Sequence, residues 1–344
     1  MSIAEEQSRM ADNNKTVLVL GAQGGIGGEV ARQLRDMGWQ VRALRRGNDD
    51  VPASEPRDGM LWLRGDAMDA QGIALAARGC SVIVHAVNPP GYRRWDELVM
   101  PMLENTLAAA RNEGATVVLP GTVYNYGPDA FRAVSEEAPQ NPVTRKGAIR
   151  ARMEERLSEE AERGGLRALI VRAGDFFGPG ARNNWFSQAL VKPGRPVSRI
   201  SVPGEPGIGH QWSYLPDVAR TIVALLACRE RLAPFARFHM AGHWDDDGMT
   251  MARKIRDAMT QHGAREPRMA RFPWWLTSVA APFSSTLREM REMHYLWRTP
   301  VRMENARLIA ALGREPHTPW DEAVQTTLAS LGCFPRAATR TVAG

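Results

Sequence analysis

The sequence contains little cysteine. Cys80, Cys228 and Cys333 are odd in number and widely spaced, so they form neither a disulfide framework nor a zinc-binding pattern. The N-terminal stretch 1–15 lacks the apolar run of a secretory signal. We therefore predict a soluble protein of a reduced compartment, the cytoplasm, without a bound metal.

Long hydrophobic runs are absent as well. No apolar stretch reaches the roughly 18 residues that a membrane-spanning helix needs. The best candidate, 272–287, contains Pro273 and Pro282 and is interpreted as a buried loop and helix. The sequence therefore predicts no membrane partner.

Lysine is scarce, because the 44 basic residues comprise four lysines and forty arginines. The arginines are spread along the chain among 38 acids, whereas a nucleic-acid-binding protein gathers its basic side chains on one stripe. The net charge of +6 therefore does not indicate a nucleic-acid partner. With 344 residues, 44% hydrophobic and 24% charged, the chain fits one large globular domain or two modest ones.

Short apolar strands alternate with amphipathic helices over the first half of the chain. The first unit, 15–46, has the pattern of a strand, a glycine loop, a helix and a second strand. Further elements are expected as strands near 60–64, 81–86, 115–119 and 167–172, and as helices near 95–113 and 142–163. Such alternation is typical of βαβ units and a parallel sheet.

After Arg172 the pattern changes. The stretch 174–212 is rich in glycine, proline and aromatic residues, and we expect it to form loops over a pocket. A helix near 216–229 and a strand near 236–240 are expected to return to the sheet. Four more helices are expected at 249–262, 284–297, 302–312 and 319–331.

The expected fold class is α/β, a Rossmann-type doubly wound parallel sheet with a smaller, mainly helical C-terminal substrate-binding part. The tail 1–14 is expected to be disordered. Residues 15–180, with a return segment 213–240, are expected to form the dinucleotide-binding domain. The substrate-binding part is expected to comprise 181–212 and 241–344.

Gly21, Gly24 and Gly27 form a GxxGxxG pattern between a predicted strand and a predicted helix. The first glycine allows the tight turn, the second lets backbone amides approach a pyrophosphate, and the third lets helix and strand pack closely. The pattern opens a βαβ unit, as a dinucleotide-binding loop must. The residues predicted to contact the cofactor here are Gly21, Gln23, Gly24, Gly25, Ile26 and Gly27.

Arg45 and Arg46 end the second predicted strand, where proteins that bind NAD usually place an acid for the ribose 2′-hydroxyl. Guanidinium groups match a 2′-phosphate in a bidentate way. The pair therefore favours NADP(H) over NAD(H), although two solvated arginines at a strand end are the alternative.

Several segments, in the right order over about residues 16–330, resemble the extended short-chain dehydrogenase/reductases, or NAD-dependent epimerase/dehydratase family. GAQGGIG resembles its cofactor loop, RGDAMDA its GDxxD segment, RAGDFFGPG its RxxNxYGP and WSYLPDVA its Asp-Val-Ala helix start. The resemblance implies that Asp66, with Ala67, lies at the adenine. It also implies that HAVNPP, with Ala86, Val87 and Asn88, lines the cofactor ribose.

The catalytic helix departs from the family pattern. Members use a Ser or Thr and, about 25 residues later, a Tyr-x-x-x-Lys whose tyrosine transfers the substrate proton. GTVYNYG resembles the serine segment and puts Thr122 at the Ser/Thr position. Counting back from Glu154, where the family often has glutamate, puts Arg150 at the lysine position and Lys146 at the tyrosine position.

Two interpretations of this helix remain open. Lys146, Arg150 and Glu154 share one helical face, which is either a solvated surface with an Arg150–Glu154 pair or a substituted catalytic site. In the second case Arg150 holds the cofactor ribose, and neighbouring positive charge lowers the pKa of Lys146 so that it acts as acid or base. Tyr124 is a second candidate for the phenol, because in an extended segment it points the same way as Thr122.

Three further residues are candidates for the substrate pocket. Asp175 occupies the family's Asn position, where a carboxylate would repel a substrate phosphate and makes UDP-sugars less suitable. His210 and Tyr214 flank Trp212 near the expected pocket mouth. His239 and His243 have a spacing that suggests zinc, but Gly242 argues against a helix there, so no metal site is predicted.

The favoured function is an NADP(H)-dependent oxidoreductase that acts on a small organic carbonyl or hydroxyl compound. The alternatives are a non-catalytic NADP(H)-binding sensor or scaffold, favoured by the missing tyrosine, and a sugar epimerase or dehydratase. The resemblance also implies a homodimer joined through the helices near 95–113 and 142–163. The apolar positions considered for that interface are Leu98, Met102, Leu107, Ile149, Met153 and Leu157.

Overall fold

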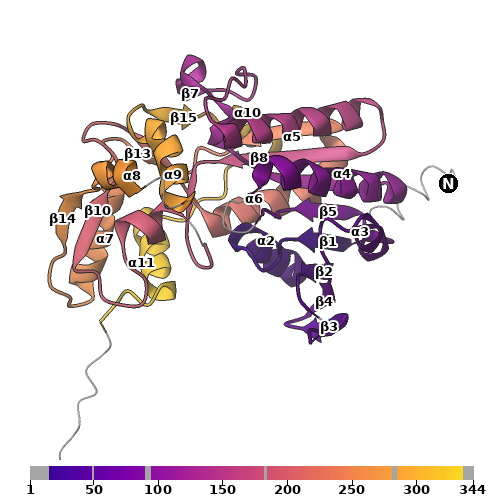
Figure 1. Cartoon of the computed structure of the whole chain (residues 1–344), viewed down its shortest axis with the longest axis horizontal. Helices are drawn as coiled ribbons and strands as arrows, with labels where there is room; N and C mark the ends of the chain where they lie inside the picture. Colours follow the sequence, from indigo (N-terminus) through magenta and orange to yellow (C-terminus); the bar gives the residue numbers. More distant parts are fainter. Residues whose placement is uncertain (1–14, 49, 90–93, 182–183, 281–284, 336–344) are drawn as a thin grey trace, which may run out of the picture.

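The computed structural model describes residues 15–48, 50–89, 94–181, 184–280 and 285–335, so the expected disordered tail 1–14 lies outside the described residues. A large sheet with helices on both faces forms one side of the molecule, and a smaller part built largely from the C-terminal third lies beside it (Figure 1). No helix in these ranges combines the length and apolarity needed to cross a membrane.

The large sheet has eight strands in the order β12-β8-β6-β5-β1-β2-β4-β3, and every neighbouring pair is parallel except β3 and β4. Its strands are β1 (Thr16–Leu20), β2 (Gln40–Arg45), β3 (Ser54–Arg57), β4 (Met60–Arg64), β5 (Val82–His85), β6 (Thr116–Thr122), β8 (Arg167–Ala173) and β12 (Phe235–His239). All five residues of β1 are buried, as expected when helices cover both faces. The α/β, doubly wound class is confirmed.

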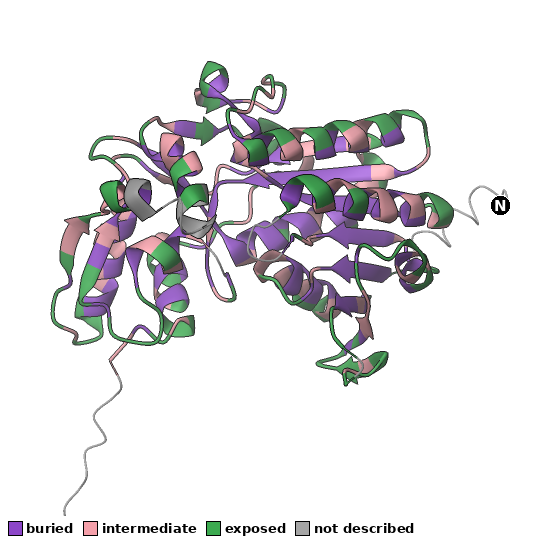
Figure 2. Ribbon diagram, in the orientation of Figure 1, coloured by how far each residue is buried: buried purple, intermediate pink, exposed green. Residues whose placement is uncertain are grey.

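Helices cover both faces of this sheet (Figure 2). One apolar layer joins it to α3 (Ala70–Ala77), α4 (Trp95–Glu113) and α5 (Arg145–Glu162). The opposite layer joins it to α2 (Gly25–Asp36), α6 (Leu215–Ala227) and α10 (Ala306–Leu312). The predicted helices of the first half are present to within a few residues, because their apolar spacing and their stops are local signals.

The smaller part holds a third apolar cluster, which includes Phe177, Trp212 and Trp297. Its helices are α7 (Thr250–Gln261), α8 (Trp274–Ala280), α9 (Ser285–Glu292) and α11 (Trp320–Ser330). Three small sheets accompany them: β9 (Asp175–Phe177), β11 (His210–Tyr214) and β13 (His243–Asp245); β10 (Arg199–Val202) and β14 (Arg268–Arg271); β7 (Arg132–Val134) and β15 (Val301–Met303).

These small sheets correct the expectation that 174–212 forms loops. β10 pairs with β14 and β11 pairs with β13, so each strand in this stretch has a partner much later in the chain. The glycines and prolines mark short turns between strands, and pairing over such distances leaves no local periodicity in the sequence.

The segment 272–287 is not wholly buried as expected. Trp275 and Leu276 at the start of α8 are 66% and 44% exposed, whereas Thr277 is buried. Residues 281–284 lie outside the described residues.

A buried ion pair fixes α5 to the sheet. Arg172 of β8 is fully buried, and its Nε donates to Glu154 Oε1 at 2.9 Å while its Nη2 contacts Glu154 Oε2. Asn125 and Gln140 also donate to the Glu154 carboxylate, at 2.9 and 3.2 Å. Arg150 is not the partner of Glu154, so the solvated-face interpretation of this helix does not describe the structure.

Candidate functional site

A cleft of about 500 Å³ opens at the carboxyl ends of the strands. It lies where the strand order reverses between β1 and β5, the place where doubly wound sheets bind ligands. Gly21 follows β1 with a φ of +87°, and a Cβ there would come 2.4 Å from Ala86 O. Only glycine therefore allows β1 and β5 to approach at this turn.

The glycine loop leads into the N-terminus of α2. Gly24 caps that helix without a side-chain hydrogen bond, so the first backbone amides face the cleft. A Cβ at Gly27 would lie 2.4 Å from Gly21 O, so Gly27 packs the helix on the turn and does not line the cleft itself. The predicted loop residues that line it are Gly21, Gln23, Gly24, Gly25 and Ile26.

The part of the cleft beside the ends of β2 and β4 contains Arg45, Arg46 and Asp66. Arg45 is 9% exposed and its Nη2 donates to Glu55 Oε2 at 2.7 Å, whereas Arg46 is exposed. Asp66 Oδ1 accepts from Met68 N at 2.9 Å. Of the two arginines, Arg46 is therefore the one that no hydrogen bond or ion pair engages within the described part of the chain.

The N-terminal turns of α5 form one wall of the cleft. Thr144 caps the helix, since its hydroxyl accepts from Gly147 N at 3.0 Å. Lys146 is only 8% exposed, and its Nζ lies 5.4 Å from the centre of the Trp95 ring. Arg150 lies over the same ring at 5.3 Å and donates to Asn88 Oδ1 at 2.8 Å.

Thr122, Lys146 and Arg150 line the same cleft. A Cβ at Gly147 would lie 2.2 Å from Tyr124 O, so the start of α5 packs directly on the turn that follows Thr122. β6 ends at Thr122 and a 3₁₀ turn, η2 (Val123–Asn125), follows, so the segment is not extended and the alternation that would align Tyr124 with Thr122 does not apply. Tyr124 nevertheless lines the cleft.

Tyr124 belongs to a hydrogen-bonded chain with Asp175 and His210. Its hydroxyl donates to Asp175 Oδ1 at 2.9 Å, and His210 Nε2 lies 2.9 Å from Asp175 Oδ2. Asp175 lines the cleft, whereas His210, a predicted substrate contact, does not and instead lines a small cavity that Asp175 also borders. Tyr214 is buried against Phe177 and does not line the cleft in the described residues, so it is no substrate contact in this structure.

Several residues that line the cleft could not be predicted from the sequence. The most informative are His85, Trp95, Trp185, Met290 and Met293, which come from four separate segments. No local signal marks Met290 or Met293, because only the tertiary fold brings α9 to the cleft. His85 ends β5 directly before Ala86, and that position was the one signal that pointed to it.

His85 is a neutral, buried base at the floor of the cleft. Thr106 Oγ1 donates to Met102 O, so its lone pair accepts from His85 Nδ1 at 2.8 Å. His85 Nε2 is then an acceptor, and it has no hydrogen-bond partner in the described part of the chain. Burial, reinforced by the positive charge of Arg150, lowers the pKa of His85 to about 3.

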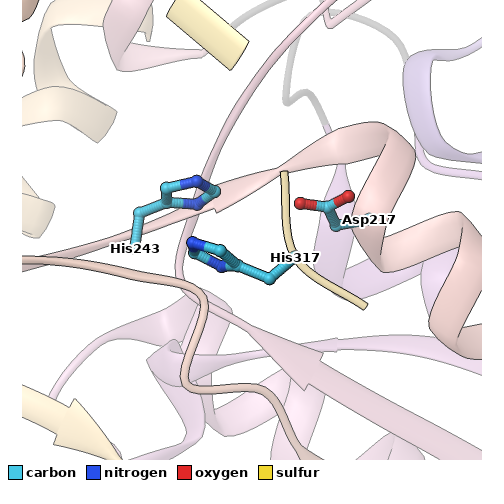
Figure 3. Close-up of side chains that lie close together, drawn as sticks. All are labelled: Asp217, His243 and His317. Atoms are coloured by element: carbon cyan, nitrogen blue, oxygen red, sulfur yellow. The ribbon is translucent and has the colours of Figure 1, made fainter. Parts of the chain in front are cut away.

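A histidine cluster lies away from the cleft, where Asp217, His243 and His317 offer ligand atoms within 4.8 Å of one another (Figure 3). The two rings stack with centroids 4.3 Å apart, an arrangement in which their in-plane lone pairs do not converge on one ion. Asp217 already accepts from Thr318 N at 2.7 Å and pairs with Arg220. Nor does His239 join His243, since its Nε2 contacts Tyr126 and Arg172.

Comparison with known proteins decides the family. Residues 17–238 match the sequence profile of the NAD dependent epimerase/dehydratase family. The chain belongs to this family. An uncharacterized protein of Sinorhizobium fredii, y4nL, is 28% identical over 243 residues, 64% of this chain and 66% of that relative. The match thus spans just under two thirds of the curated relative's length.

Solved structures with a similar fold superpose on nearly the whole of this chain. A UDP-glucose 4-epimerase of Thermus thermophilus in complex with NAD has a TM-score of 0.66 at 21% identity, covering 92% of this chain and 98% of its own. DesIV, a dTDP-glucose 4,6-dehydratase of Streptomyces venezuelae with NAD bound, has a TM-score of 0.67 at 19% identity, covering 92% and 96%. At these identities the likeness shows the fold alone.

The residues of the epimerase/dehydratase cleft fit a nicotinamide dinucleotide. The glycine turn and the α2 amides offer an anion cradle, and His85 Nε2 offers a buried acceptor beside it. Cations at both ends of the cleft, Arg46 and the Lys146–Arg150 pair, suit a ligand with separated phosphates and a ribose.

The buried histidines predict acid sensitivity. Burial lowers the pKa of His85 and His239 to about 3 and that of His243 to about 4, from 6.5. Since the unfolded chain binds these protons below pH 6.5 and the folded chain does not, stability falls as pH drops through this window. Urea unfolding should lose about 2 kcal/mol per histidine between pH 7 and pH 5.

The variant His243→Gln checks the assignment, because glutamine retains a donor for Thr318 O without titrating. It should remove about a third of the loss between the two pH values. A free energy of unfolding that stays level from pH 7 to pH 5 would contradict the buried neutral histidines.

Proposed function

We propose that this protein is an NADP(H)-dependent oxidoreductase acting on a small organic carbonyl or hydroxyl compound. The observation that carries the proposal is the position of Lys146, a buried cation that lines the cleft beside Arg150 at the helix turns where the family resemblance places Tyr and Lys. Lys146 and Arg150 together bring positive charge to this part of the cleft, where it stabilises a negatively charged ligand or an oxyanion that develops on a substrate.

Different residues along the cleft bind the cofactor and orient the substrate. When bound, the nicotinamide supplies or accepts a hydride. The glycine turn and α2 amides hold the pyrophosphate, and Arg46 favours a 2′-phosphate. Arg150, oriented by Asn88, holds the nicotinamide ribose. Lys146 and Thr122 orient the substrate oxygen and stabilise its developing negative charge.

The substrate half of the cleft favours an apolar compound over a nucleotide sugar. Its lining includes Trp185, Phe176, Met290 and Met293, and Asp175 adds a carboxylate to them. A diphosphate would meet repulsion at that position. The structural neighbours named above act on nucleotide sugars, and a sugar epimerase or dehydratase is the third candidate function for this chain.

A non-catalytic NADP(H)-binding sensor is the second candidate. The absence of tyrosine from α5 favours it, because the family's acid–base group is then missing from its usual helix. The buried position of Lys146 supports the enzyme instead, since a sensor has no need of a cation at that turn. A cytoplasmic location is part of the proposal, supported by three buried free cysteines.

NADPH should bind at least ten times more tightly than NADH, a difference of about 1.4 kcal/mol. Calorimetry on Arg46→Ala should show most of the preference lost, because Arg45 is engaged by Glu55. The matched variant Glu55→Gln frees Arg45 and should keep or raise the NADPH affinity. Equal affinities for the two cofactors, or a preference untouched by replacing both arginines, would sink the NADP(H) assignment.

Lys146→Ala should lower turnover on the order of 100-fold and leave NADPH affinity within threefold, since one stabiliser of the developing charge is lost. Arg150→Ala should weaken NADPH binding as well. The readout is NADPH consumption with a panel of aldehydes and ketones. Arg152→Ala is the control, because Arg152 lies on the same helix and is exposed. If the unmodified protein reduces no panel compound, the sensor is favoured. Full turnover by Lys146→Ala would contradict the role of Lys146 in stabilising the developing charge.

The proposed homodimer through α4 and α5 is a further prediction. Met102, Leu107, Met153 and Leu157 are buried within the chain, so a partner would have to use the half-buried Leu98 and Ile149 with the charged outer faces. Light scattering at micromolar concentration should give the mass of two chains. A mass of one chain, 38.0 kDa, would refute the dimer.

A further inference from the structure

We propose that Tyr124 is the catalytic acid–base of this oxidoreductase, and that Asp175 and His210 are positioning residues that hold its hydroxyl and take up its proton. This inference rests on the proposed function and names the group that replaces the phenol missing from α5. It assigns the proton transfer to a residue outside α5, the helix that carries Lys146.

The hydrogen-bonded chain is continuous from the cleft to the core. Tyr124 Oη donates to Asp175 Oδ1 and His210 Nε2 contacts Asp175 Oδ2, both at 2.9 Å. Asp175 and His210 are each 6% exposed, whereas Tyr124 is half-buried and lines the cleft. One end of the chain can therefore meet substrate, and the other end is sheltered from solvent.

Two tryptophan rings hold the His210 side chain in one orientation. Its ring stacks on Trp297 with centroids 3.7 Å apart and planes 8° from parallel, and it meets Trp212 in a T-shaped contact with ring centroids 5.0 Å apart. An imidazole fixed in this way cannot rotate its Nε2 from the carboxylate. With Asp175 ionised, Nε2 donates, and both oxygens of the carboxylate have a defined donor.

Backbone packing places the three residues together. Asp175 begins β9 and pairs with Trp212 of β11, the strand that His210 begins. A Cβ at Gly174 would lie 2.3 Å from Gln211 O, so the chain before Asp175 approaches β11 as closely as only glycine permits. Tyr124 comes from the 3₁₀ turn η2, on which Gly147 of α5 packs. The phenol and the α5 cations thus line one cleft.

In alcohol oxidation, one proton and one hydride leave the substrate. The substrate hydroxyl proton moves to Tyr124 Oη while the phenol proton moves to Asp175 Oδ1. The carbon–hydrogen bond breaks with its electron pair passing to oxidised nicotinamide dinucleotide, and the carbonyl forms. Carbonyl reduction is the reverse and starts from neutral Asp175, with Lys146 stabilising the charge on the substrate oxygen.

The first experiment observes Tyr124 without turnover. The chain has five tyrosines, so full-length protein carrying tyrosine labelled with ¹³C at the ζ carbon gives a simple spectrum, and Tyr124→Phe identifies the Tyr124 signal. NADP⁺ is added to saturation and then 4-nitroacetophenone, which cannot be reduced by the oxidised cofactor. The Tyr124 signal should shift with the ketone, and Asp175→Asn should at least halve that shift.

The second experiment measures reduction of the same ketone, and of the panel compounds, by NADPH. Tyr124→Phe should lower kcat on the order of 100-fold with KM and NADPH affinity within threefold. His210→Gln should keep more of kcat than His210→Leu, because the glutamine amide can still donate to Asp175. Tyr295→Phe is the matched control, since the Tyr295 hydroxyl is buried without a hydrogen-bond partner among the described residues and does not line the cleft.

The outcomes separate this inference from the proposed function. Failure of NADP⁺ or NADPH to bind in calorimetry overturns the proposed function and this inference with it. Two outcomes overturn the role of Tyr124 alone. In the first, NADP⁺ binds but the Tyr124 signal does not shift when the ketone is added. In the second, Tyr124→Phe keeps the full kcat while Lys146→Ala loses kcat. Equal kcat in His210→Gln and His210→Leu overturns the positioning role of His210.

Discussion

The buried ion pair between Glu154 and Arg172 is the constraint on which the cleft depends. Arg172 is fully buried in β8, and Glu154 is 2% exposed on α5, so each charge relies on the other for compensation. Removing one partner of such a pair typically costs about 3–5 kcal/mol, because the remaining charge is left buried. The same carboxylate accepts from Asn125 in the turn after β6, which ties strand, turn and helix at one point.

This anchor sets where the rest of α5 points. Residues four and eight positions before Glu154 share its face of the helix, and at the N-terminal end that face meets the cleft in place of the core. Lys146 and Arg150 are therefore presented to the ligand by the same geometry that buries Glu154. Asp175, which lines the same cleft, brings negative charge to the Tyr124 hydroxyl. In the proposed oxidoreductase the α5 cations stabilise charge and Tyr124 moves a proton.

Features with a local signal could be predicted from the sequence. The glycine turn, the buried β1 and the helices of the first half follow from residue type and spacing, and counting from Glu154 gave the two cations of α5. Features that depend on distant partners could not. The pairing of β10 with β14, the engagement of Arg45 by Glu55 and the 3₁₀ turn at Tyr124 arise only when segments far apart meet. Asp175 and His210 were each predicted to lie at the pocket. The hydrogen bond between them could not be predicted, because it depends on the pairing of β9 with β11.

A crystal structure with NADP⁺ bound tests the central claim most directly, because it shows which chain atoms surround the nicotinamide. In this complex we expect the pyrophosphate on the α2 amides, the 2′-phosphate at Arg46, and the nicotinamide between Tyr124 and the Lys146–Arg150 pair. A nicotinamide that points away from α5, or Lys146 turned to solvent in the complex, would contradict it and leave the chain a dinucleotide-binding protein without this chemistry.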